Sequence, residues 1–435
     1  MKKSNNNFNK VVVKTKDIKL EDNKKVDFKE KFKNISKKNN IKLIRLMLFL
    51  LFTYICLFII GYHSTYLIKT VIKWFLLLLS IISFGILILL IIIFINNKDK
   101  TKLKWTRWIY DGFTYIYVVG ATVFLVILYG PDYGFRDWLI STAMRTMNHK
   151  YICQIFYNEK EIQESLGRNY LVEPDGETDT SLIHKAELVT YKNKYEEEIL
   201  SRKNNQDYKM IKFKVNGQQA YLAVIYDPSR VFVGVSKNIG RTGEYVTKMS
   251  SRYGAKVAVN GGNFVDLKHV GTGGEPIGVT ISKGKVYSDE AYSNHGLVGF
   301  NEDDVLVLYK NKSANEAKKL GVRDCVTAKP FLIVNGKAAI TKGNGGWGYA
   351  ARTAIGQRED GIVLLLVVDS NETRTKGASM KDLTDIMLRY GAINASALDG
   401  GTSSVMVENS KLISDPIDGS FNHRTRPIAT SILFK

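Results

Sequence analysis

Cysteine is scarce in this chain: three of the 435 residues are cysteines. So few thiols exclude a disulfide-stapled scaffold and a cysteine-rich zinc framework. Cys56 falls inside an apolar run, whereas Cys153 and Cys325 do not, and the sequence leaves open whether these two pair. No spacing of His, Cys and Asp is typical of a zinc site, so we expect neither a metal nor another cofactor.

Several nucleotide-binding and hydrolase motifs are also missing. The chain has no GxxxxGKS or GxxxxGKT loop and no GxGxxG ahead of a helix, which excludes the common nucleotide-binding loops. It has no GxSxG motif, and Ser403 and Ser404 have no recognisable His partner motif. A serine hydrolase is therefore disfavoured.

Positive charge, by contrast, is abundant, with 62 Lys and Arg against 42 Asp and Glu and a net charge of +20. Such a balance first suggests a nucleic-acid partner. The charge is concentrated, however: residues 1–45 hold 15 Lys and Arg against 5 acidic residues, and 96–107 hold 5 against 1. Because these segments flank apolar runs and the chain after Arg107 is nearly balanced, we expect no nucleic-acid partner.

Three apolar runs, 46–61, 74–95 and 112–130, are candidates to span a bilayer, which needs about 20 apolar residues. For the third run, a buried core helix is the alternative. The positive-inside rule places the basic segments 1–45 and 96–107 in the cytoplasm. We therefore predict a multi-pass protein of the cell membrane, in contact with bilayer lipid, whose N-terminus is cytoplasmic and whose chain after 130 is extracytoplasmic.

The domain organisation follows from this pattern. Residues 1–45 form a disordered basic tail, 46–130 the three-helix transmembrane anchor, 131–206 a juxtamembrane helix and linker, and 207–435 the external domain. In this last region short apolar runs alternate with turns, which predicts an α+β fold with a mixed β-sheet and flanking helices. The expected strands are 221–226, 231–235, 256–259, 362–368 and 395–398, and the expected helices are 243–253 and one that begins after Ser379 and ends at Gly391.

Four glycine-rich joints lie between these elements, at 260–264, 271–278, 345–348 and 399–404. Glycine permits positive φ and lets backbone N–H groups approach an anion closely. Tight turns without a ligand are the alternative for each joint. Because three of the joints also carry Asn, Glu or Asp, together they favour a binding site.

Two carboxylates, Asp369 and Asp399, each end an apolar run, where a side chain can face a cleft. A carboxyl pair can supply a general acid and a nucleophile or base for glycosyl transfer. A turn-capping role is the alternative for each. Arg352 follows the third joint and offers a planar fork suited to phosphate, as do Arg424 and Arg426. His295 lies in a turn and is either a substrate contact or a capped loop residue.

At these residues the sequence resembles the phosphodiester glycosidase family, over roughly 207–435. The likeness rests on the motifs at 260–264, 276–278, 352–356 and 398–404 together with the shorter matches Gly299-Phe300, Pro330, Asn335-Gly336, Asp369 and Arg426-Pro427. The membrane-spanning region followed by 138–157 is similar to anchored bacterial versions, some of which are named exopolysaccharide biosynthesis proteins.

The resemblance implies a hydrolase, a glycosidase that cleaves the glycosidic bond of a sugar-1-phosphodiester in cell-surface glycans. Under this interpretation Asp399 is the nucleophile or base, Asp369 the second carboxylate, and Arg352 an anion-stabilising catalytic group. The substrate-binding residues would be Asn260, Gly261, Gly262, Gly400, Gly401, Thr402, His295 and Arg426. The chain departs from the family after Asp369, where Ser370 and Asn371 replace a common Gly-Arg and Arg374 is a possible substitute cation.

Two other functions remain open from the sequence. One is a non-catalytic glycan-binding or exopolysaccharide assembly protein that uses the same cleft. The other is a transferase or hydrolase that acts on phosphate-linked wall polymers such as teichoic or capsular glycans. The intact set of Asn260, Arg352 and Asp399 favours an enzyme.

Overall fold

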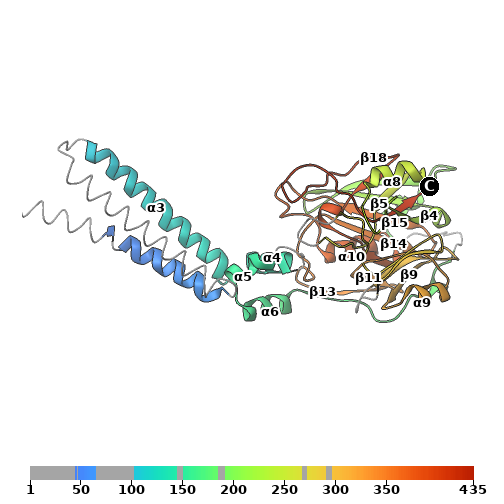
Figure 1. The fold of residues 1–435 in the computed structure, drawn as a ribbon, viewed down its shortest axis with the longest axis horizontal. Coiled ribbons are helices and arrows are strands. Elements are labelled where there is room, and N and C mark those ends of the chain that lie inside the picture. Colours follow the sequence, from blue (N-terminus) through green and yellow to red (C-terminus); the bar gives the residue numbers. More distant parts are fainter. Residues whose placement is uncertain are drawn as a thin grey trace, which may run out of the picture. The chain divides into compact units, whose positions relative to one another are not determined.

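The computed structural model describes residues 45–46, 48–64, 102–144, 150–184, 192–266, 272–290 and 296–435. The chain divides into two compact units, Met1–Pro131 and Asp132–Lys435. Figure 1 shows the helices of the first unit and the strands and helices of the second.

The first unit contains two apolar helices among its described residues. The longer one, α3 (Lys102–Tyr129), includes Asp111–Tyr129, which is long and apolar enough to cross a membrane. The shorter one, Leu48–His63, packs on α3 through a 3.2 Å hydrogen bond from Tyr117 to Thr53.

This unit corrects the prediction of three spans. Only the third predicted run, 112–130, coincides with a helix of sufficient length among the described residues. The first run, 46–61, forms the shorter helix, and the second, 74–95, lies outside the described residues.

The second unit is built on three larger sheets and one two-stranded ribbon. The seven-stranded sheet has the spatial order β12 (Lys337–Ala338), β11 (Phe331–Val334), β16 (Ala392–Ala397), β14 (Arg352–Arg358), β15 (Val363–Val368), β3 (Gln218–Ile225) and β2 (Tyr208–Val215). One five-stranded sheet has the order β18 (Lys411–Leu412), β17 (Met406–Glu408), β5 (Val257–Asn260), β19 (Thr430–Phe434) and β4 (Val231–Val235). The other has the order β7 (Lys285–Asp289), β6 (Val279–Ser282), β10 (Val322–Thr327), β8 (Gly296–Asn301) and β9 (Leu306–Lys310).

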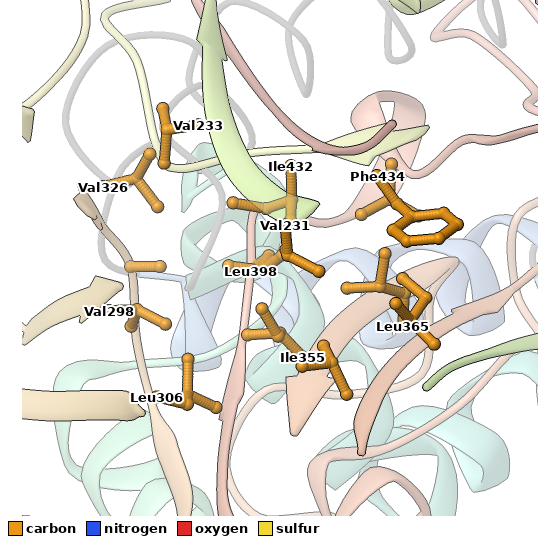
Figure 2. Packing of buried hydrophobic residues seen from close by; sticks show 14 of the residues in the cluster. Val231, Val233, Val298, Leu306, Val326, Ile355, Leu365, Leu398, Ile432 and Phe434 are labelled. Atoms are coloured by element: carbon orange, nitrogen blue, oxygen red, sulfur yellow. The ribbon is translucent and has the colours of Figure 1, made fainter. Parts of the chain in front are cut away.

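The main core lies where the three sheets meet. Side chains of the seven-stranded sheet, such as Ile355 and Leu365, face Val231 and Ile432 of one five-stranded sheet, and Val298 of the other closes the cluster (Figure 2). Each fully buried aliphatic side chain of this kind contributes roughly 1.5–3 kcal/mol relative to an exposed one.

Helices cover the outer faces of the sheets. α10 (Met380–Arg389) and α7 (Lys194–Leu200) pack on the seven-stranded sheet, α8 (Val246–Tyr253) on the sheet of β5, and α9 (Ala314–Lys319) on the sheet of β10. The seven-stranded sheet is therefore covered on both faces, which explains why β15 is apolar throughout.

The N-terminal part of this unit packs with the rest. It contains the helices α4 (Gly134–Met144), α5 (Lys150–Phe156) and α6 (Glu159–Arg168), and the 3₁₀ turn η1 (Thr180–Leu182). Its strand β1 (Tyr170–Val172) pairs with β13 (Ile340–Lys342). Buried Glu196 of α7 lies 3.9 Å from the guanidinium of Arg358. The predicted linker thus supplies a strand and a helix to the compact unit.

The predicted α+β class is confirmed, and the predicted strands and helices appear within a few residues of their expected bounds. Ser379 caps α10 with Asp382 in a reciprocal capping box, and Gly254 ends α8 with φ +64°. The single mixed sheet is wrong: among the described residues every strand pair is antiparallel, across several sheets. Cys153 and Cys325 are both free and buried, so they do not pair.

Candidate active site

Asn260 joins two sheets beneath the predicted site. It is the last residue of β5, fully buried, and its Nδ2 donates to the carbonyl of Asp399 at 2.7 Å. Its Oδ1 accepts from the hydroxyl of Thr353 at 2.7 Å and from the N–H of Val405 at 3.2 Å. Since Thr353 belongs to β14 and Val405 precedes β17, this one amide fixes the turn that carries Asp399 to both sheets.

The glycines that follow Asn260 allow close packing of the backbone. A Cβ at Gly261 would lie 2.5 Å from the hydroxyl of Thr430, and one at Gly262 would lie 2.5 Å from the carbonyl of Thr327. The N–H groups of both glycines donate to Thr430, at 2.9 and 3.1 Å. The prediction of an open anion-binding nest at 260–262 is therefore corrected: its donors are used within the protein, and the segment positions Asp399.

Asp399 is half-buried and lies just beyond β16, among groups of both charges. Burial raises the pKa of its carboxyl, and Asp266 adds to the rise. A hydrogen bond from Ser403, the charge of Arg426 and the N–H of Gly400 oppose it. The carboxyl is thus held in a desolvated setting with donors and a cation directed at it, as a reacting carboxylate requires.

Arg352 begins β14 and extends its buried side chain toward the same turn. Its Nη2 donates to the carbonyls of Trp347 at 2.5 Å and Gly348 at 3.2 Å, and its Nε to that of Ala378 at 3.3 Å. A Cβ on Gly400 would lie 3.3 Å from Nη1, a tight contact, so glycine favours this close approach. Burial lowers the pKa of Arg352 to about 10, with the charge of Asp399 opposing the shift, so the residue stays cationic at neutral pH.

The loop that accepts from Arg352 is held by the N-terminal helices of the second unit. Asn344 donates from Nδ2 to the hydroxyl of Ser141 in α4 at 2.7 Å, and its N–H donates to Asn169, which ends α6, at 3.2 Å. Side-chain atoms at Gly348 would clash with Thr142 of α4. The position of Arg352 therefore depends on helices that precede the predicted catalytic domain.

Asp369 follows β15 and belongs to a different charge environment. Burial raises its pKa to about 6, and the nearby charge of Asp415 adds to the rise while the N–H of Asp415 opposes it. That N–H donates to Asp369 at 3.1 Å. The carboxylate of Asp415 in turn contacts His423 at 2.7 Å, and His423 contacts Glu372 at 2.8 Å.

Comparison with known proteins gives this arrangement a family. Residues 253–435 match the family model described as phosphodiester glycosidase. That stretch includes Asn260, Arg352, Asp369 and Asp399. This stretch, less than half of the chain, is similar to the phosphodiester glycosidase family.

The curated relatives of the chain are distant. The chain is 29% identical over 204 residues to the SPbeta prophage-derived uncharacterized protein YomE of Bacillus subtilis (strain 168), covering 44% of this chain and 30% of that protein. It is 29% identical over 181 residues to the N-acetylglucosamine-1-phosphodiester alpha-N-acetylglucosaminidase of Bos taurus, covering 38% and 33%. The chain thus spans about a third of the length of the curated relatives it matches.

A solved structure also matches in part. It is the catalytic domain of the zebrafish N-acetylglucosamine-1-phosphodiester alpha-N-acetylglucosaminidase, auto-inhibited by its pro-peptide. The match has 22% identity and a TM-score of 0.45, and it covers 54% of this chain and 85% of that one.

Within the stretch that matches this family, the predicted residues form two groups. Arg352, Gly400 and Arg426 gather around Asp399, through the contacts and charges described above. Thr402 binds the carbonyl of Ile417 at 3.3 Å and so ties this turn to the loop 414–424. Asp369 lies instead with Asp415, and His295 falls outside the described residues.

Three polar residues near Asp399 were missed in the sequence. Asp266 is buried, accepts from Arg426 at 2.6 Å and acts on the charge of Asp399. Ser403 forms a hydrogen bond with the carboxyl of Asp399, and the hydroxyl of Thr353 donates to Oδ1 of Asn260. Ser403 and Thr353 lie inside the motifs at 398–404 and 352–356, and these positions hinted at a role. Asp266 lies in no such motif. Among the described residues no group of three or more His, Cys, Asp or Glu side chains is placed to hold a metal ion.

Proposed function

We propose that the second unit is a hydrolase that cleaves the glycosidic bond of a sugar-1-phosphodiester. The observation that carries the proposal is the setting of Asp399, a desolvated carboxyl under the charges of Arg352 and Arg426 within the family-matched domain. The name of the Bos taurus relative, N-acetylglucosamine-1-phosphodiester alpha-N-acetylglucosaminidase, indicates the class of substrate.

The reaction breaks the bond between the anomeric carbon and the phosphate oxygen. The oxygen keeps the electron pair and leaves as a phosphomonoester, while water supplies the new oxygen on the sugar and gives up a proton. Asp399 acts at the anomeric carbon, either as nucleophile or as the base that takes the proton from water. Because the phosphate is already a good leaving group, the arginines stabilise its growing charge and matter more than a general acid.

Asp369 is proposed as the second carboxylate. Its pKa of about 6 allows it to exchange a proton near neutral pH. Gly401, Thr402 and Arg426 would line the sugar-phosphate pocket, and His295 is retained as a proposed substrate contact.

We further propose that the enzyme is anchored in the cell membrane with its catalytic unit outside the cytoplasm and acts on phosphate-linked cell-surface glycans. The apolar stretch Asp111–Tyr129 and the basic segments 1–45 and 96–107 support this topology. A reporter enzyme that works only outside the cytoplasm should be active when it is fused after residue 200, and one that works only in the cytoplasm should be inactive there. A reporter active in the cytoplasm at that position would refute the topology.

The activity is tested with the full chain in detergent and the methyl ester of N-acetylglucosamine-1-phosphate as substrate. Wild type should release free N-acetylglucosamine, and Asp399→Asn should lower kcat by about 1,000-fold or more, because the reacting oxyanion is lost. Asp303→Asn, at an exposed turn, is the matched control and should leave the rate unchanged. Full activity in Asp399→Asn would refute the assignment, and binding without sugar release by wild type would indicate a glycan-binding protein instead.

A further inference from the structure

The loop between β15 and α10 holds an arginine in an uncommon backbone conformation. Arg374 has φ +57°, in the left-handed region that residues other than glycine seldom occupy. Asn371 holds the loop: its Oδ1 accepts from the N–H groups of Thr375 at 2.8 Å and Lys376 at 2.7 Å, and its carbonyl accepts from the N–H of Arg374 at 2.7 Å. The loop therefore maintains Arg374 in a conformation that the free chain would avoid.

The guanidinium of Arg374 is half-buried and faces two glycines. A Cβ on Gly401 would lie 4.0 Å from its Nη2, and one on Gly419 would lie 3.7 Å from its Nη1. Within the part of the chain that the structure describes, this guanidinium donates no hydrogen bond and forms no ion pair. Partly desolvated N–H donors of this kind cost free energy until an acceptor binds them.

The charged groups near Arg374 do not supply the acceptor that its N–H donors lack. Burial lowers the pKa of Arg374, and the second guanidinium at Arg426 lowers it further, while the charge of Asp418 raises it. Asp418 is already occupied: its Oδ1 accepts from the N–H groups of Ser420 at 2.7 Å and Asn422 at 3.0 Å, and its Oδ2 accepts from Arg424. Two guanidiniums thus act on each other, and Asp418, the carboxylate whose charge raises the pKa of Arg374, has its oxygens engaged elsewhere.

The position of this pair relates it to the reacting carboxyl. Arg426 acts on the charge of Asp399, and Arg374 faces Gly401, two residues further along the same turn. Arg352, on the other side of the turn, donates to three backbone carbonyls and so has fewer donors to offer.

We propose that Arg374 and Arg426 together bind the phosphate of the substrate beside Asp399, with Arg374 supplying the open guanidinium fork. This inference rests on the proposed function, because it takes the ligand to be the phosphate attached to the reacting sugar carbon. Arg352 then stabilises the transition state through its charge and positions the turn, while the guanidiniums of Arg374 and Arg426 bind the anion.

The test uses the full chain in detergent, with two substitutions, Arg374→Gln and Arg374→Lys. Inorganic phosphate is the probe for the anion site, both as an inhibitor of sugar release and in calorimetric binding. Arg374→Gln should raise KM for the methyl phosphodiester and the inhibition constant of phosphate by about 10- to 100-fold, because charge-assisted hydrogen bonds are lost. Arg374→Lys, which keeps the charge without the fork, should fall between wild type and Arg374→Gln.

The matched control is Arg389→Gln, at an exposed arginine of α10 whose guanidinium lies 4.9 Å from the Tyr195 ring centroid. This substitution should change neither KM for the methyl phosphodiester nor the inhibition constant of phosphate. Thermal unfolding of each variant checks folding, and Arg374→Lys decides the question if Arg374→Gln does not fold.

The outcomes separate this proposal from the proposed function. If Arg374→Gln keeps the wild-type KM and phosphate inhibition, the anion site is refuted while the hydrolase stands. If wild type releases no sugar yet binds phosphate in a manner that Arg374→Gln abolishes, the anion site stands and the hydrolase falls. Absence of phosphate binding by wild type overturns the anion site.

Discussion

Asp399 and Asp369 follow the same pattern in sequence but lie in opposite electrostatic surroundings. Asp369 comes directly after β15 and Asp399 two residues after β16, and burial raises the pKa of both. Asp399 is met by the charges of Arg426 and Arg352, whereas Asp369 is met by another carboxylate, Asp415. The difference shows that the charges around a strand-end carboxylate are set by the loops that pack against it.

The largest expected effect comes from removing the cation beside Asp399. Arg352→Gln should lower kcat by about 100- to 1,000-fold, because a preorganised charge no longer stabilises the transition state. Loss of the cation should also raise the pKa of Asp399, so the acidic limb of the kcat/KM profile should move to higher pH. An unmoved limb would show that Arg352 does not act on Asp399.

The next effect concerns Asp369 and the pH dependence of stability. Its folded-state pKa of about 6 lies above the ordinary 3.8, so the folded protein binds this proton more tightly than the unfolded chain. Stability should therefore fall as the pH rises from about 4 to about 6, by up to about 3 kcal/mol. Asp369→Asn, which keeps an acceptor for the N–H of Asp415, should remove this fall.

Thermal unfolding of the full chain in detergent at pH 4.5 and 7.5 measures the effect of Asp369→Asn. Asp303→Asn, at an exposed turn, is the control and should keep the wild-type pH dependence. Equal pH dependence in Asp369→Asn and wild type would show that Asp369 ionises in its ordinary range, and the contrast with Asp399 would lose its basis.

A smaller effect is expected from the loop behind Arg352. Asn344→Ala removes the side-chain bond that ties this loop to Ser141 of α4, so kcat should fall by about tenfold while KM changes little, because Arg352 is displaced but the anion site is untouched. Lys337→Ala, at an exposed position in β12, should alter neither constant. A rise in KM with kcat unchanged would show that the loop contacts substrate directly.

The smallest effect concerns His423, which bridges Asp415 and Glu372 and so joins the loops 414–424 and 370–376. Both carboxylates raise the pKa of His423, so its charged form is favoured in the folded protein. The bridge should therefore be complete below about pH 6.5 and weaken as the pH rises through the raised pKa. We expect His423→Gln to raise KM by about twofold at pH 6 and to match wild type at pH 9. A constant ratio across this range would contradict the bridge.

Much of the local structure was predictable from the sequence. The runs 231–235 and 362–368 match β4 and β15 within one residue, because short apolar runs between turn residues indicate buried strands. Ser379 and Gly254 marked helix ends for equally local reasons. The three-sheet arrangement was not predictable, since strands that pair, such as β5 with β17 and β19, are distant in the chain.

The sequence by itself determined the segments, the apolar stretch of α3, the scarcity of thiols and the strand-end position of Asp399, because each depends on neighbouring residues. Only the tertiary structure decided which groups surround that carboxyl. Asn260 reaches Thr353 and Asp399 across 93 and 139 positions, and the guanidinium of Arg426 reaches Asp266 across 160. Such contacts depend on how the sheets stack, a non-local result of packing that spacing along the chain does not encode.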